Sequence, residues 1–357
     1  MTLLSTKDFQ VTAPALLFDP EFYIFDYAVE TQTSKFLVVE EKKLELAPFV
    51  DIRFLPLAQG EFSIAAKELY ALEKMHGIKR PQSAFIFHHA FVCSTLLARC
   101  LNQIDAFFSL KEPWILRRLA DIKRSQYHSM NDKKWAEMFS CHLGLLAKNY
   151  HSGKAPVIKV TNVANNLIVD ILRYLPEDKI LYLYSDLRSF LVSNLKKPQE
   201  TQVKMPGLAI NFFKDSDLAR KYPQFCDIGR LSFLQVCALI WVLNLYNFKS
   251  STEQQLQNVK TLEMNDFLED MGGSLKRLSR YFNHSASSGE VEAMLDPSVT
   301  QTNAKQQQLS YGRNTKQTET SFVLDKFNFE IEKALHWINP LVEELEVLEY
   351  CRVNTLV

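Results

Sequence analysis

The chain has 357 residues, of which 47% are hydrophobic, and its 41 Lys and Arg residues balance 41 Asp and Glu residues. A net charge of zero provides no long-range field to attract polyanions, so the composition disfavours a general nucleic-acid-binding protein. The apolar content is ample for a buried core, which excludes a wholly disordered chain. We therefore expect a globular protein of one large or two smaller domains.

The sequence shows no pattern typical of export or of a structural metal site. The N-terminus lacks a basic stretch followed by a long apolar one, so no secretory signal or transit peptide is visible. The adjacent His88 and His89 should face opposite sides of a strand, and the cysteines at positions 93, 100, 141, 226, 237 and 351 include no CxxC pair. These patterns predict a cytoplasmic protein with free thiols and no metal.

The first 78 residues are predicted to form a β-rich appendage that ends in a helix. Residues 22–30 and 35–41 are dense in aromatic and β-branched side chains, with a turn-forming segment between them, and predict a hairpin. From Phe62 to about Gly77 the apolar residues recur with helical spacing. We therefore expect a hairpin followed by one helix in this region.

Residues 79–357 are predicted to form one α/β domain. Five short apolar runs each precede a helical segment: 84–88 before 94–102, 106–110 before 113–124, 157–160 before 163–174, 179–185 before 187–196, and 259–264 before 266–271. Strands that alternate with helices form a parallel sheet covered on both faces. The sequence therefore predicts a doubly wound α/β fold.

Three other segments interrupt or follow this alternation. Residues 135–150 and 231–248 are predicted helical insertions, and the second is an uncharged segment close to membrane-spanning length. Because it contains Ser, Gln and two Asn residues, we expect a buried helix and no membrane partner. Residues 283–321 are polar and predict a long surface loop that acts as a lid, whereas 322–348 return to helical periodicity.

The turn after the first strand of this domain combines the features of an anion-binding site. Residues 85–88 form the strand, a short loop follows, and Ser94 and Thr95 open the next helix. The N–H groups and the positive dipole end of a helix stabilise a phosphate or sulfate at its start, and the two hydroxyls add donors. The alternative is that Ser94 only caps the helix.

At this turn the sequence resembles the sulfotransferase superfamily. The family's phosphosulfate loop runs from a strand through a basic residue, Ser, Gly and two Thr into a helix, and residues 91–97 occupy those places. Residues 110–118 are similar to the segment that carries a Glu after the second strand. Residues 182–193 are similar to the segment whose Arg and Ser hold the 3′-phosphate of the cofactor.

This resemblance implies a P-loop-like fold and a transferase activity. A sulfuryl group would pass from 3′-phosphoadenosine-5′-phosphosulfate to a hydroxyl or amine of a small-molecule or peptide acceptor. Glu112 is the candidate general base, since it follows the second strand and precedes Pro113. The candidate cofactor-binding residues are His89, Cys93, Ser94, Thr95, Arg99, Lys159, Arg188, Ser193 and Lys305.

Simpler interpretations exist for the charged members of this set. Glu112 can be a carboxylate that stabilises a helix start, and Lys159 can be a strand-end lysine that reaches solvent. Arg188 can form a surface ion pair, and Lys305 can belong to a polar loop. None of these interpretations requires a ligand.

Departures from the family pattern leave two other function classes open. In the phosphosulfate loop, Cys93 occupies the position of the family's glycine and Phe91 that of its basic residue. When Ser193 is aligned with the family's Ser of the 3′-phosphate segment, Ser185 occupies the position of its Arg. These departures favour a non-catalytic protein of the same fold that binds or assembles. Cys93 and Arg99 also match the C-x5-R spacing of cysteine-dependent phosphatases, although the apolar residues between them are typical of a helix interior.

Overall fold

A computed structural model describes residues 3–5, 10–78, 80–126, 130–148, 150, 153–301 and 313–356. The chain divides into two compact units. The first comprises Met1–Ile86 and Leu101–Lys179, and the second comprises Phe87–Cys100 and Ile180–Val357. The strand that opens the predicted α/β domain crosses this division, since it begins in the first unit and ends in the second.

The predicted parallel sheet is present. Its strands are β6 (Ala84–His88), β7 (Phe107–Lys111), β8 (Ala155–Lys159), β9 (Lys179–Tyr184) and β10 (Val259–Glu263). Their order is β10-β9-β6-β8-β7, so β6 is the central strand, and the pairs β10·β9, β6·β8 and β7·β8 are parallel. The chain reverses its direction of winding at β6, which is where open α/β sheets bind ligands.

The helices that follow these strands begin within a few residues of their predicted positions. They are α4 (Ser94–Leu101), α5 (Trp114–Gln126), the 3₁₀ helix η3 (Asn162–Leu167) with α7 (Ile168–Tyr174), α8 (Leu187–Leu195), and α13 (Met264–Glu269) with α14 (Met271–Tyr281). Every residue of β6 and β7 is buried, as expected for strands covered on both faces. The doubly wound fold class is therefore confirmed.

The N-terminal region contains the predicted hairpin, together with a third strand that overlaps the start of the predicted helix. Strands β3 (Phe22–Ala28), β4 (Thr33–Val38) and β5 (Gly60–Ala65) form an antiparallel sheet, and α3 (Ala66–His76) begins only after β5. The helix predicted from Phe62 is wrong over its first turn. Phe62 and Ile64 alternate with exposed neighbours, and Phe62 stacks on Phe36 of β4 with ring centroids 5.5 Å apart. Cross-strand packing therefore prevails over the local helical periodicity.

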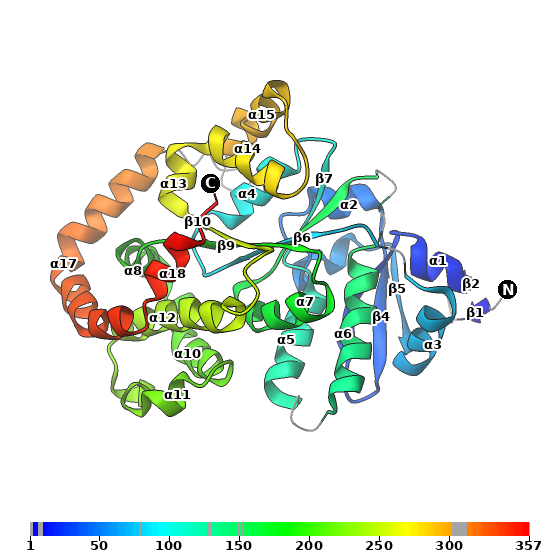
Figure 1. Cartoon of the computed structure of the whole chain (residues 1–357), viewed down its shortest axis with the longest axis horizontal. Helices are drawn as coiled ribbons and strands as arrows, with labels where there is room; N and C mark the ends of the chain where they lie inside the picture. Colours follow the sequence, from blue (N-terminus) through cyan, green and yellow to red (C-terminus); the bar gives the residue numbers. More distant parts are fainter. Residues whose placement is uncertain are drawn as a thin grey trace. The chain divides into compact units, whose positions relative to one another are not determined.

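Among the described residues, the first unit contains six further elements outside the two sheets described above. They are β1 (Leu3–Ser5), β2 (Gln10–Thr12), α1 (Ala13–Phe18), α2 (Glu41–Leu46), η1 (Ile52–Leu57) and α6 (Asp132–Leu146). Helices α5 and α6 both contact β3, and they run beside each other in Figure 1. Helix α6 is the insertion predicted at 135–150, and much of its length is buried.

Helix α12 (Phe233–Thr252) is the core of the second unit. A capping box of Ser232 and Gln235 starts it, and it packs on α8, α10 (Met205–Lys214), α17 (Arg313–Glu344) and α18 (Val347–Val353). Buried residues lie on all its sides, as predicted for the uncharged segment 231–248. Among the residues that the structure describes, no helix has the length and apolar character needed to cross a membrane.

In the described parts of the polar segment 283–321, which exclude residues 302–312, helices are present where a long loop was predicted. Residues Ser288–Met294 form α15, residues Pro297–Thr300 form α16, and α17 begins at Arg313. A capping box of Ser287 and Glu290 starts α15, and buried Met294 and Val299 anchor the segment. The second unit also contains α9 (Gln199–Gln202), α11 (Leu218–Lys221), η4 (Pro223–Phe225) and η5 (Ile228–Arg230).

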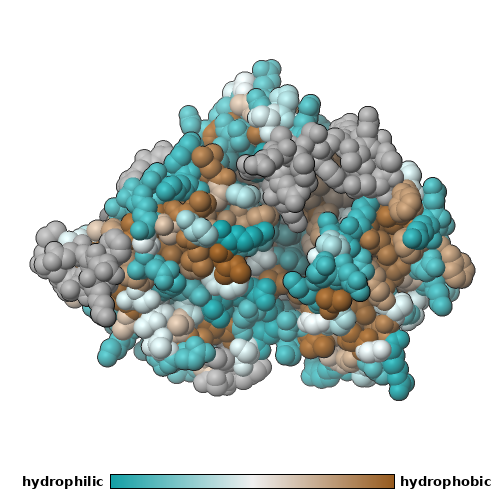
Figure 2. Space-filling model, turned by 180° about the vertical axis from the view of Figure 1, so that it is seen from behind, coloured by the Kyte–Doolittle hydropathy of each residue, from teal (hydrophilic) through white to brown (hydrophobic). Residues whose placement is uncertain are grey.

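Exposed hydrophobic side chains lie on several different elements. Among the described residues, the most exposed large side chains of this kind are Phe322 and Phe329 on α17, Met75 on α3, Val353 on α18 and Val203 after α9. Hydrophobic and hydrophilic surface is interspersed on the face of the molecule in Figure 2. Scattered apolar residues are ordinary on protein surfaces and do not by themselves indicate a binding surface.

Lys148, just beyond α6, is a buried cation held by main-chain groups. Its ammonium group donates to the carbonyl of Phe22 at 2.9 Å and to that of Leu16 at 3.2 Å. Burial lowers its pKa to about 7, although the nearby charge of Asp19 acts in the opposite direction. The charged form of Lys148 therefore opposes folding at neutral pH and below.

Replacing Lys148 with Met is expected to flatten the pH dependence of stability. Between the folded pKa of about 7 and an unfolded value of about 10.4, the unfolded chain binds a proton that the folded chain releases. The free energy of unfolding of the wild type should therefore rise with pH relative to the variant over this range. Urea unfolding of both proteins at about pH 6, 8 and 10 measures the difference. Parallel curves would show that Lys148 does not titrate in this range.

Candidate functional site

The turn after β6 adopts a backbone conformation that usually requires glycine. Phe91 has φ 69° and Cys93 has φ 59°, and α4 begins at the next residue, Ser94. In the left-handed region a Cβ atom costs about 1–2 kcal/mol, so both residues are strained. Left-handed residues in a turn can direct successive N–H groups toward one point, where they can bind an anion.

Ser94 and Thr95 place two hydroxyl groups at the start of α4. Each residue is 6% exposed, and neither hydroxyl makes a hydrogen bond to the part of the chain that the structure describes. Ser94 lies inside the helix, and the first helical bond runs from the Leu97 N–H to the Cys93 carbonyl at 3.0 Å. The interpretation of Ser94 as a helix cap is therefore not supported, and both hydroxyls remain as donors for a ligand.

His89 is buried and links this turn to the turn after β9. Its Nε2 accepts a hydrogen bond from the Ser185 N–H at 2.8 Å, which assigns the ring proton to Nδ1, and Nδ1 donates to the Ala90 carbonyl at 2.9 Å. The Ser185 carbonyl accepts from the Trp241 indole at 2.9 Å. Burial lowers the pKa of His89 to about 4, so the ring is neutral at physiological pH. His89 thus supports the turn and supplies no positive charge.

Arg99 lies in the last turn of α4, about 7.5 Å along the helix axis from Ser94. Its guanidinium group donates to the carbonyl of Ser298 in α16 at 3.5 Å. Burial lowers its pKa from the ordinary arginine value. The structure therefore brings Arg99 to α16, where it joins two helices of the second unit.

Arg188 and Ser193 lie on different sides of α8. They are five residues apart, which corresponds to about 140° around a helix. Arg188 donates to Asn328 at 3.4 Å and forms an ion pair with Glu332, both on α17. The hydroxyl of Ser193 makes no hydrogen bond to any described residue. The structure therefore separates these two candidates, and Lys305 lies outside the described residues.

In the first unit, Glu112 and Lys159 form an ion pair at the ends of β7 and β8. The Lys159 ammonium group lies 2.5 Å from Oε1 of Glu112, and its side chain is 1% exposed. The Glu112 N–H donates to the Lys159 carbonyl at 2.7 Å, and Glu112 has φ 56°. A partly exposed carboxylate is thus fixed by a buried cation and by a strained backbone.

The N-terminal region supplies residues to this pair that the motifs do not include. The Val50 N–H donates to the Lys111 carbonyl at 2.7 Å, and the Val50 carbonyl accepts from the Trp114 N–H at 3.0 Å. Val50 therefore makes main-chain hydrogen bonds to residues on both sides of Glu112. The Phe49 ring lies 3.8 Å from the guanidinium carbon of Arg53 and 6.0 Å from the Lys159 ammonium group. No local sequence signal identifies the contacts of Val50 with Lys111 and Trp114 or that of Phe49 with Lys159, because they join segments about 60 residues apart or more.

Lys197 is a second residue that sequence analysis missed. Its ammonium group lies 4.6 Å from the ring centroid of Phe91, which is a residue of the turn after β6. The Phe91 ring in turn lies 6.0 Å from that of Phe190 in α8. The Lys196-Lys197 pair at the end of the predicted helix 187–196 is the available signal, but it resembles an ordinary solvated helix end.

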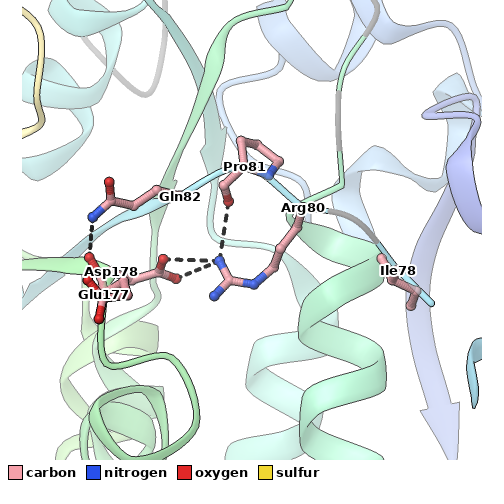
Figure 3. A pocket seen from close by; sticks show the side chains of 6 residues that line it. All are labelled: Ile78, Arg80, Pro81, Gln82, Glu177 and Asp178. Carbon is pink, nitrogen blue, oxygen red and sulfur yellow. Dashed lines mark hydrogen bonds and ion pairs between the residues drawn. The ribbon is translucent and has the colours of Figure 1, made fainter.

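A pocket of about 430 Å³ lies in the first unit, at the amino ends of the strands. Figure 3 shows its lining side chains, Ile78, Arg80, Pro81, Gln82, Glu177 and Asp178. Arg80 donates to both carboxylate oxygens of Asp178 at 2.9 and 3.0 Å, and Asp178 also accepts from the Ser83 N–H. These groups hold the segments before β6 and β9, so we assign this pocket a structural role.

No model of a known protein family matches the sequence, and no curated protein sequence matches it. Among solved structures, the chain is similar to the sulfotransferase domain from the curacin biosynthetic pathway, with 13% identity, 65% of this chain and 84% of that chain covered, and a TM-score of 0.40. Sulfotransferase STF1 from Mycobacterium tuberculosis H37Rv is 12% identical, with 74% of this chain and 82% of that chain covered and a TM-score of 0.40. The sulfotransferase domain of the Synechococcus PCC 7002 olefin synthase is 12% identical, with 68% of this chain and 84% of that chain covered and a TM-score of 0.40. Similarity of this degree concerns the fold and assigns no role to any residue of this chain.

The variant Cys93→Gly is expected to be more stable than Cys93→Ala by about 1 kcal/mol, because alanine keeps a Cβ atom in the left-handed conformation. Urea unfolding of the two variants gives the difference. Cys226 offers a matched control, since its φ of −82° is right-handed and glycine there should be the less stable substitution. Equal stability of the two Cys93 variants would contradict the strained turn.

Proposed function

We propose that this chain is a sulfotransferase-like protein that binds 3′-phosphoadenosine-5′-phosphosulfate and transfers its sulfuryl group to a hydroxyl or amine acceptor. The observation that carries the proposal is the turn after β6. It ends the central strand of a parallel sheet, contains two left-handed residues without glycine, and presents Ser94 and Thr95 at a helix start. This combination suits an anionic group of the size of phosphate or sulfate.

The residues of the turn fit the phosphosulfate end of such a cofactor. The nearly buried hydroxyls of Ser94 and Thr95 have no hydrogen-bond partner among the described residues, and oxygen atoms of a bound anion would accept from them. The cofactor, when bound, supplies the sulfuryl group and a phosphate leaving group. The turn would hold and orient that group by its N–H and O–H donors.

Glu112 is the proposed proton acceptor. Its carboxylate is partly exposed, so an acceptor hydroxyl or amine can approach it, and Lys159 fixes its orientation through Oε1. A base placed in this way removes the proton that the acceptor must lose as its oxygen or nitrogen forms the new bond to sulfur. Lys159 is then a positioning residue, because it acts through Glu112.

A non-catalytic binding protein of the same fold is the second candidate. Three observations favour it: His89 is neutral, the segment 89–95 contains no Lys or Arg, and Arg188 is already paired with Glu332. A cysteine-dependent phosphatase is not proposed. Cys93 is followed by helix α4 where an open phosphate loop would be needed, and Arg99 is bound at α16.

Calorimetric titration with 3′,5′-adenosine bisphosphate, the cofactor product, tests the binding part of the proposal. The double variant Ser94→Ala/Thr95→Val should bind about 10- to 100-fold more weakly than the wild type, since two hydrogen bonds to a charged ligand are lost. Its unfolding free energy should change by less than about 1 kcal/mol, because the hydroxyls have no other partner in the described chain. Adenosine is the control ligand, and unchanged affinity of the double variant would place the site elsewhere.

Glu112→Gln tests the catalytic part. If Glu112 is the base, single-turnover transfer from labelled cofactor to a mixed acceptor pool should slow by about 10²–10⁴, with affinity for the bisphosphate nearly unchanged. Thermal melting identifies any loss of stability from leaving buried Lys159 without its carboxylate. The double variant Glu112→Gln/Lys159→Met removes both charges and should recover that stability without recovering transfer. Transfer that survives in Glu112→Gln would exclude Glu112 as the base.

A further inference from the structure

The turn after β6 contains no positive charge of its own, although a phosphate or sulfate dianion needs one for tight binding. Residues 89–95 include no Lys or Arg, and His89 is neutral because burial lowers its pKa to about 4. Arg99, the next cation along the chain, is bound to the Ser298 carbonyl. A cation at the start of this turn would come from an element that packs against the turn within the second unit.

Lys197 is a cation that the structure places against the turn. Its ammonium group lies 4.6 Å from the ring centroid of Phe91, which is within the range of a cation–π contact. Its main chain is fixed at the end of α8, where the Lys197 N–H donates to the Asn194 carbonyl at 3.1 Å. The Phe91 ring is itself held next to Phe190, with ring centroids 6.0 Å apart.

We propose that Lys197 is the cationic ligand-binding residue of the turn after β6, and that it contacts a phosphate or sulfate ester bound at the start of α4. This inference rests on the proposed function, because it concerns the same anion site. Phe91 is a residue of the turn with φ 69°, and its ring holds the ammonium group by a cation–π contact when no ligand is bound.

The chemistry of the lysine side chain suits this role. An ammonium group has three N–H donors and a full positive charge, which suit the oxygen atoms of a phosphate or sulfate. A cation–π contact is weak compared with a charge-assisted hydrogen bond, and the four-carbon stem is flexible. The ammonium group can therefore move from the ring to a ligand oxygen while its main chain stays fixed at the end of α8.

The chain offers a matched control one residue away. Lys196 is the C-terminal cap residue of α8 and carries the same charge, so Lys196→Gln and Lys197→Gln change the net charge equally. We expect Lys197→Gln to weaken binding of 3′,5′-adenosine bisphosphate and of inorganic pyrophosphate by about 10- to 100-fold in calorimetric titration. Lys196→Gln should change either affinity less than about 3-fold. Lys197→Arg should recover most of the lost affinity, because it restores the charge.

A second measurement tests the contact between Lys197 and Phe91 without any ligand. Protons on the Lys197 side chain that lie over the Phe91 ring should show an upfield shift in NMR spectra of protein labelled at lysine. Phe91→Leu should abolish that shift and leave the signals of Lys196 unchanged. Persistence of the shift in Phe91→Leu would overturn the contact, and thermal melting confirms that the variant is folded.

The outcomes separate this inference from the proposed function. If the wild type binds the bisphosphate and the two Gln variants bind it equally, the role of Lys197 is wrong and the cofactor proposal stands. If only pyrophosphate binds, and Lys197→Gln weakens it, Lys197 is an anion ligand and the nucleotide proposal is wrong. If the wild type binds neither compound, both proposals are wrong.

Discussion

Burial of the parallel sheet on both faces is the constraint on which the rest of this structure depends. All residues of β6 and β7 are buried, so polar groups on these strands and at their ends have little access to bulk water and need partners nearby. Lys111 donates to the carbonyls of Glu45 and Ser109, and Lys159 pairs with Glu112. The buried imidazole of His89 is bound by main-chain groups for the same reason. The polar chemistry of this protein is therefore concentrated where buried strands end.

Strained turns follow from the same constraint. Phe91, Cys93 and Glu112 adopt left-handed conformations without glycine, each in a turn that connects a buried strand to a helix. Such conformations persist only where the surrounding structure holds both ends of the turn. Here the strand fixes one end and a helix the other, and aromatic contacts such as that of Phe91 with Phe190 hold the side chains between them. In the turn after β6, these strained residues directly precede the hydroxyls of Ser94 and Thr95 at the start of α4.

The candidate residues differ in what packing allows them to do. Ser94 and Thr95 retain hydroxyls without a hydrogen bond in the described chain, and Ser193 does so on α8. Arg99 and Arg188 are engaged by α16 and α17 instead. Residue type alone therefore does not show which candidates the packing engages, because a long charged side chain can bond to any carbonyl or carboxylate within its reach.

The sequence by itself determined the alternation of strands and helices and the start of α4 at Ser94, because buried strands and amphipathic helices have local periodicities. It did not determine β5, whose Phe62 packs on Phe36 of a neighbouring strand, or the helices of the polar segment, which depend on buried Met294 and Val299. Only the tertiary structure decided that His89 is neutral, that Val50 spans the Glu112 turn, and that Lys197 rests on Phe91. Protonation states and contacts between distant segments follow from burial and packing, and no local pattern of residues encodes them.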